Sequence, residues 1–187
     1  MGRNTALNAF ILLLVLFYAG CGKKDAEHNG VINQDEFQWK ESISAEDIPD
    51  FPVKAFLNGK AIQINYVSFE SWRGSRDNVL NFSSVKPAQQ CGYMENYQGV
   101  QVLNRGNPIV SGIWAKLKFD EYPGSYHVFY KYMNSDLTGY KSDCDWNCAL
   151  EIDNISPKIV TGKIAVCFND KDKSWIAGKF EAAVCNN

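Results

Sequence analysis

From residue 51 onward, apolar and polar side chains alternate along the chain with a period of two, which is the spacing of a strand that buries one face. The first two runs, residues 53–57 and 60–69, are separated by Asn58 and Gly59. Both turn residues tolerate the positive φ angles that a two-residue hairpin loop requires. The pattern therefore predicts that the folded region begins with a β-hairpin.

Further alternating runs follow, and residues typical of turns separate them. They span residues 79–85, 100–104, 113–119, 126–133, 149–155, 159–168 and 175–184. No stretch after residue 50 keeps a helical period over about twelve residues. We therefore predict an all-β domain over residues 51–187, either an antiparallel β-sandwich or a small closed β-barrel of about eight strands.

The charge balance argues against one class of partner. The chain has 187 residues, with 19 Lys and Arg against 21 Asp and Glu, and a formal net charge of −2. Hydrophobic residues make up 45% and charged residues 21%, which is ordinary for a globular protein. A near-neutral chain without a basic patch lacks the electrostatic footprint of nucleic-acid-binding proteins, so we expect no nucleic-acid partner.

The N-terminal segment has the layout of an export signal. Arg3 is followed by an apolar or small stretch at residues 9–20, which is too short to span a membrane as a helix. The stretch ends in Ala-Gly directly before Cys21, and small residues at this place resemble the lipobox of bacterial lipoproteins. The resemblance implies that residues 1–20 are a signal peptide and that Cys21 is lipidated.

The lipoprotein resemblance also implies a location. Acyl chains on Cys21, with palmitate a typical example, anchor the mature chain to a membrane. In well-studied lipoproteins an aspartate after the cysteine signals retention in the inner membrane, and Gly22 stands there instead, which implies the outer membrane of the bacterial cell envelope. The hairpin segments at residues 55–62 and 160–185 resemble those of small uncharacterised bacterial lipoproteins, a likeness that implies a β-domain.

Residues 21–50 are polar and rich in acidic side chains, which is typical of a solvated tether. Within the tether, the run from Asp25 to Glu36 resembles an EF-hand calcium loop, with Gly30 at the sharp turn. Glu27 is longer than the Asp or Asn that the third ligand position needs, and too few residues precede the loop for an entering helix. We therefore predict no tight calcium site, no other metal site and no cofactor.

Five cysteines remain after lipidation, and disulfides form and persist in exported proteins. The odd number leaves one thiol free or paired outside the chain. We predict a disulfide between Cys91 and Cys185, which joins a central loop to the last strand. For a second disulfide, either Cys144 pairs with Cys148, or one of these two pairs with Cys167. Cys167 lies on a predicted strand, so the alternative for this residue is a buried free thiol.

The sequence lacks the motifs of common hydrolases, phosphate-binding loops and dinucleotide-binding folds, so we expect a non-enzymatic protein. Aromatic and Arg side chains in apparent loops favour a binding surface. The candidate ligand-binding residues are Trp72, Arg73, Tyr93, Tyr97 and Trp146. The leading hypothesis is a lipid-anchored envelope protein that binds a protein or a glycan through its loops. The alternatives are a structural or assembly lipoprotein without a small ligand and a periplasmic hydrolase. For the loop aromatics themselves, the alternative is that these rings fold back as caps over an open end of the sandwich.

Overall fold

The computed structural model describes residues 37–94, 97–133 and 139–186; Cys21, the predicted signal peptide and the calcium-like run lie outside them. No helix in the described part of the chain is long and apolar enough to cross a membrane. The elements are η1, a turn of 3₁₀-helix (Ala45–Asp47), β1 (Lys54–Leu57), β2 (Lys60–Ile62), β3 (Tyr66–Trp72), β4 (Asp77–Ser83), β5 (Gly99–Asn104), β6 (Gly112–Lys116), β7 (Tyr126–Met133), β8 (Gly139–Lys141), β9 (Trp146–Ile155), β10 (Ile159–Phe168) and β11 (Trp175–Asn186).

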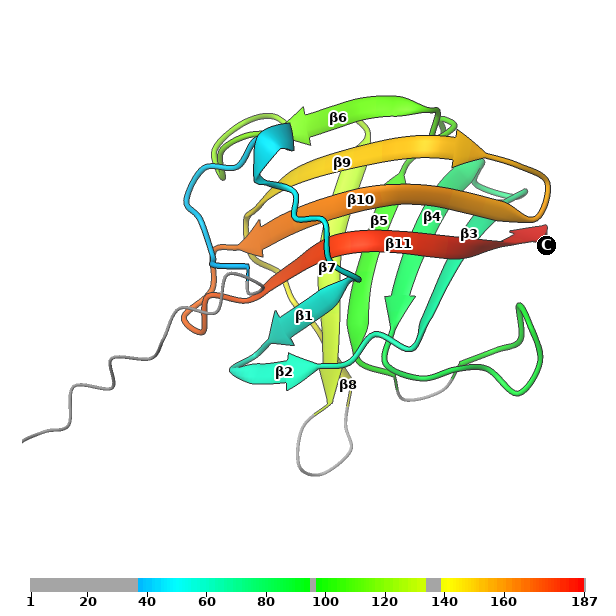
Figure 1. Cartoon of the computed structure of the whole chain (residues 1–187), viewed down its shortest axis with the longest axis horizontal. Helices are drawn as coiled ribbons and strands as arrows, with labels where there is room; N and C mark the ends of the chain where they lie inside the picture. Colours follow the sequence, from blue (N-terminus) through cyan, green and yellow to red (C-terminus); the bar gives the residue numbers. More distant parts are fainter. Residues whose placement is uncertain (1–36, 95–96, 134–138, 187) are drawn as a thin grey trace, which may run out of the picture. The chain divides into compact units, whose positions relative to one another are not determined.

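The strands form one sheet in the order β6-β9-β10-β11-β3-β4-β5-β7-β8, and β1 and β2 extend it beside β11 (Figure 1). Strands β9 to β11 and strands β3 to β7 cross at a steep angle in Figure 1, so the sheet curls around its core. The all-β prediction is confirmed. The closed barrel is not formed, because β6 and β8 do not pair, and the strands belong to one open, curled sheet rather than to the two sheets of a sandwich. Both edge strands are short and offer few backbone groups for closure.

Strand β11 divides one of its edges between two partners. Its N-terminal half pairs with β1 in antiparallel fashion, and its C-terminal half pairs with β3 in parallel fashion. Gly178 lies at the junction with a φ of 128°, and a Cβ there would lie 2.7 Å from the Phe51 carbonyl oxygen. The glycine therefore allows the backbone before β1 to approach β11 closely.

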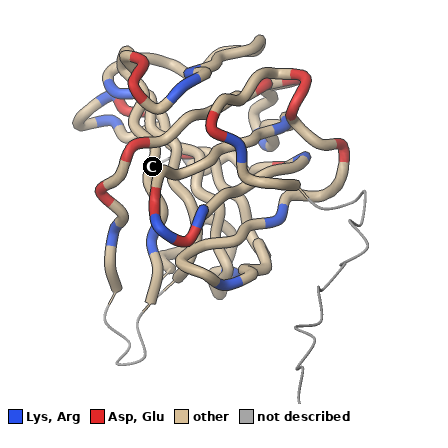
Figure 2. The backbone as a smooth tube through the Cα atoms, turned by 90° about the vertical axis from the view of Figure 1, so that its left-hand side faces the viewer, with Lys and Arg blue, Asp and Glu red and all other residues tan. Residues whose placement is uncertain are grey.

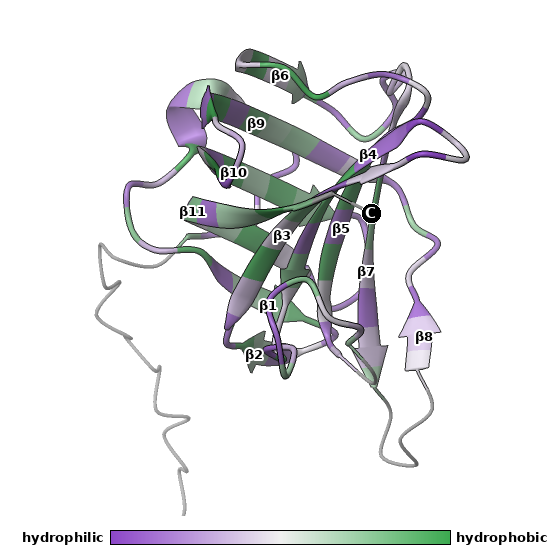
Figure 3. Ribbon diagram, turned by 90° about the vertical axis from the view of Figure 1, so that its right-hand side faces the viewer, coloured by the Kyte–Doolittle hydropathy of each residue, from purple (hydrophilic) through white to green (hydrophobic). Residues whose placement is uncertain are grey.

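The concave face of the curled sheet holds the main hydrophobic core. Alternate residues of β4 and β5 point into it, and Leu80, Phe82, Val100 and Val102 are fully buried. Hydrophobic and hydrophilic residues alternate visibly along these strands in Figure 3. The ring of Phe82 meets that of Phe180 from β11 edge to face, with centroids 5.2 Å apart. This contact joins the two halves of the sheet across the core.

Residues 37–50, which we expected to be solvated, pack on the opposite face of β9, β10 and β11. Phe37, Ile43 and Ile48 are buried there in a second apolar cluster. The ring of Phe37 lies 5.3 Å from that of Trp175. Alanine residues of the three strands leave room for these large side chains, so isolated apolar residues in a polar segment find a place against the sheet.

The disulfide prediction is confirmed for one pair. Cys91 and Cys185 are bonded, with Cα atoms 5.4 Å apart. The second pair is not formed, because Cys144 and Cys148 are free thiols. Cys148 lies within β9 and points into the main core, whereas Cys144 lies in the bend that precedes this strand. Cys167 on the neighbouring strand faces the other side of the sheet. It is a buried free thiol, which confirms the alternative predicted for this residue.

Candidate binding groove

Polar side chains occupy the outer face of the sheet where β3, β4 and β5 lie side by side. Asn81 and Gln101 are paired by the register of β4 and β5, and both are buried. Asn81 Nδ2 donates to Glu70 Oε1 at 2.7 Å, and Gln101 Nε2 donates to Asn81 Oδ1. Trp72 Nε1 donates to Glu70 Oε2 at 2.9 Å. Glu70, Asn81 and Gln101, which we call the polar floor, therefore hold one another in fixed orientations.

The connection between β4 and β5 lies beside the polar floor and is attached to the sheet at Cys91. The disulfide joins Cys91 to Cys185 near the end of β11, and the Cys91 N–H donates to Tyr66 Oη at 3.1 Å. The same connection carries Tyr93 and Tyr97. The two attachments therefore hold the connection beside the outer face of the sheet, where Tyr97 is partly buried and Tyr93 is 87% exposed.

Two adjoining cavities, of about 490 and 280 Å³, lie between this connection and the sheet. They share four lining residues and so form one continuous depression, which we call the loop groove. The shared residues are Tyr93, Met94, Tyr97 and Lys131. The larger cavity also contacts Glu70, Trp72, Asn81, Cys91, Gly92 and Gln101. The smaller cavity extends to Met133, Gly139, Tyr140 and Lys141.

Lys131 and Tyr97 contact each other at the centre of the loop groove. Lys131 Nζ donates to Tyr97 Oη at 3.0 Å and lies 4.7 Å from the centre of the tyrosine ring. Burial lowers the pKa of Lys131, whereas burial and the charge of Glu70 raise the pKa of Tyr97 to about 12. The phenol of Tyr97 therefore stays protonated at neutral pH and remains a hydrogen-bond donor.

The smaller cavity ends at a second lysine. Lys141 Nζ lies 3.8 Å from the centre of the Phe129 ring and 3.3 Å from His127 Nε2. Burial, together with the charges of Lys141 and Arg105, lowers the pKa of His127, so its imidazole is neutral at pH 7. The groove thus has the carboxylate of Glu70 at one end, the ammonium group of Lys131 at its centre and that of Lys141 at the other end.

The structure brings together three of the five predicted ligand-binding residues. Trp72, Tyr93 and Tyr97 all line the loop groove. Arg73 lies in the exposed turn between β3 and β4 and does not line it. Trp146 is not in a loop, because it begins β9 and is only 6% exposed within the main core. The apolar alternation of β9 begins three residues before the predicted strand, and this correction removes Trp146 from the candidate surface.

The polar floor and the two lysines were not identified from the sequence. Asn81 and Gln101 each stand between apolar residues in predicted strands, so the alternation does place them on the outer face. Their meeting depends on the register between β4 and β5, which a pattern along the chain does not reveal. An outward polar residue in each of two consecutive strands is the signal that could have suggested the pair.

Comparisons with protein-family models, curated proteins and solved structures found no match. In the residues that the structure describes, no three His, Cys, Asp or Glu side chains are grouped so that they could hold a metal ion. The chemistry of the groove is therefore argued from its geometry. Glu70 accepts hydrogen bonds from Ser68, Asn81 and Trp72, which hold its carboxylate in place as an acceptor for a ligand.

Proposed function

We propose that this chain is a non-enzymatic, lipid-anchored protein of the bacterial cell envelope whose β-domain binds a ligand in the loop groove. One observation carries the binding role: aromatic side chains from three separate elements line a groove whose larger cavity has a pre-formed polar floor. These are Trp72 of β3, Tyr97 of the β4–β5 connection and Tyr140 of β8. Aromatic walls with a few oriented polar groups are typical of ligand sites, and fixed side chains lose little entropy on binding.

The location rests on two supports. The resemblance of residues 1–21 to lipoprotein signals supports lipidation of Cys21, and Gly22 favours the outer membrane. The disulfide between Cys91 and Cys185 agrees with export, because disulfides persist in oxidising compartments. A groove on the outer face of a tethered β-domain would be accessible to the glycans and proteins of the envelope.

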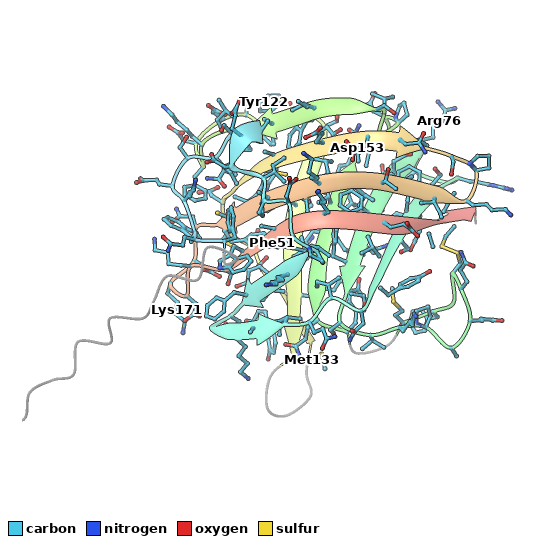
Figure 4. All side chains as sticks on the ribbon, in the orientation of Figure 1. Phe51, Arg76, Tyr122, Met133, Asp153 and Lys171 are labelled. Atoms are coloured by element: carbon cyan, nitrogen blue, oxygen red, sulfur yellow. A yellow bond between two sulfur atoms is a disulfide. The ribbon has the colours of Figure 1, made fainter. Side chains whose placement is uncertain are left out.

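The test uses residues 22–187, which contain every described strand, and immobilised envelopes from a strain that lacks this protein. We expect the wild-type domain to be retained and Tyr97→Ala to lower its affinity roughly ten-fold, because one central aromatic contact is lost. Tyr122→Ala is the matched control, since Tyr122 is exposed and lies far from Met133 at the groove (Figure 4). Equal retention of all three proteins, or no retention of the wild type, would refute binding through the loop groove.

A further inference from the structure

The smaller cavity of the loop groove is lined by two lysines, although the formal net charge of the chain is −2. Lys131 and Lys141 line the smaller cavity, and no carboxylate is among the described residues that line it. Elsewhere acidic and basic residues are interspersed along the backbone (Figure 2). The two lysines are therefore a local feature of the groove, and they favour a ligand that carries negative charge.

Aromatic rings are distributed along the whole length of the groove. Trp72 stands on β3, Tyr97 lies at the centre, and Tyr140 stands on β8. Strands β3, β4, β5, β7 and β8 are consecutive in the sheet, so the groove crosses four strand spacings, about 19 Å along the sheet. This length and the repeated rings favour an extended ligand that offers several flat apolar faces in succession.

The polar floor retains hydrogen-bonding capacity for such a ligand. An ionised carboxylate has about four lone-pair sites, and Glu70 uses two on Oε1, for Ser68 and Asn81, and one on Oε2, for Trp72. One site on Oε2 is therefore left for a donor from the ligand. The Tyr97 phenol can donate to the ligand in turn. A hydroxyl group, which both donates and accepts, matches this pair.

We infer that the ligand is an acidic oligosaccharide, whose sugar rings stack on the groove aromatics and whose carboxylates pair with Lys131 and Lys141. The inference rests on the proposed binding function. Sugar rings offer apolar C–H faces rimmed by hydroxyl groups, which fits aromatic walls above a polar floor. An acidic peptide carries carboxylates too, but it does not present a hydroxyl-rimmed ring at every step. Uronic acids and the lactyl-bearing amino sugars of cell walls share this carboxylate chemistry.

The experiment measures binding of residues 22–187 by calorimetry to three probes. They are a tetramer of galacturonic acid, its neutral methyl ester, and a tetrasaccharide of alternating N-acetylglucosamine and N-acetylmuramic acid. We expect at least one acidic probe to bind roughly ten-fold more tightly than the ester, since a charged hydrogen bond is lost in the ester. Whichever acidic probe binds identifies the source of the carboxylate. The affinity should fall as salt rises.

Variants locate the carboxylate contact. Lys131→Gln and Lys141→Gln should each weaken binding of the acidic probe roughly five- to ten-fold and weaken binding of the ester much less. Lys60→Gln, at an exposed lysine of β2, should change neither. Equal binding of acid and ester, abolished by Tyr97→Ala, would overturn the acidic class and leave groove binding intact. If no glycan binds but envelopes are still retained in a Tyr97-dependent manner, the ligand is a protein and this inference fails alone. Loss of both signals would overturn the proposed function as well.

Discussion

Replacing Cys91 and Cys185 with alanine removes the disulfide that ties the β4–β5 connection to the end of β11. The bond joins residues that are 94 apart in sequence, with Cα atoms 5.4 Å apart. In the chain-entropy model, closing a loop of this length lowers the entropy of the unfolded chain by an amount worth about 4–5 kcal/mol at 25 °C. We expect the double variant to lose about 4 kcal/mol of stability and to remain folded, because the main hydrophobic core is large.

Urea unfolding, followed by tryptophan fluorescence, measures this loss. With an m value of about 2 kcal/mol/M, the midpoint should fall by about 2 M. Dithiothreitol is the control: it should lower the wild-type midpoint by the same amount and leave the double variant unchanged, since Cys144, Cys148 and Cys167 are free thiols.

Two results would refute this reasoning. A midpoint change below about 0.5 M would mean that other contacts hold the connection and that the loop-closure argument does not apply. A further decrease of the double variant in reductant would reveal a second disulfide and overturn the assignment of the three free thiols.

Three further changes test other parts of the structure. Lys116 is buried, and its Nζ donates to three backbone carbonyl oxygens at 2.5 to 2.9 Å. Lys116→Met should therefore lower the free energy of unfolding by about 2–4 kcal/mol, and an unchanged urea midpoint would contradict this. Burial raises the pKa of Tyr126 from 10.0 to about 12, so the contribution of this tyrosine to stability is complete below pH 10 and is lost toward pH 12. The melting temperature of the wild type should therefore fall between pH 10 and 12, and that of Tyr126→Phe should fall less. Identical slopes of melting temperature against pH would count against the assignment. Cys21→Ser should yield an unprocessed or soluble chain in cell fractionation, and a variant found in the membrane at the mature mass would disprove the lipid anchor.

Local chemistry made most strands predictable. Asn58 and Gly59 adopt φ angles of 50° and 75°, as the hairpin prediction requires, and the strands on either side follow the predicted alternation. Strand β8 was missed because three residues, Gly139–Lys141, are too few to show a period. The predicted run at residues 60–69 forms two strands, β2 and β3, which residues 63–65 separate. Strand β2 pairs with β1, whereas β3 pairs with β11 and β4.

Non-local contacts account for what the sequence did not reveal. The alternation says which residues face outward but not which strands become neighbours, so the parallel pairing of β3 with β11 and the open edges were not predictable from it. The loop groove depends on those neighbours. Tyr93 and Tyr97 were found because aromatic residues in loops are conspicuous, whereas Gln101 and Lys131 acquire their role only when β5 and β7 pair.

Nuclear magnetic resonance tests the central claim, that the loop groove is the binding site, most directly. Isotope-labelled residues 22–187 would be titrated with polysaccharide fragments released from isolated envelopes. We predict that the amide signals that shift belong to Tyr97, Gln101 and Lys131, and that the Tyr97→Ala variant shows no such shifts. Shifts confined to a different surface, such as the cavity beside Phe119, would contradict the account.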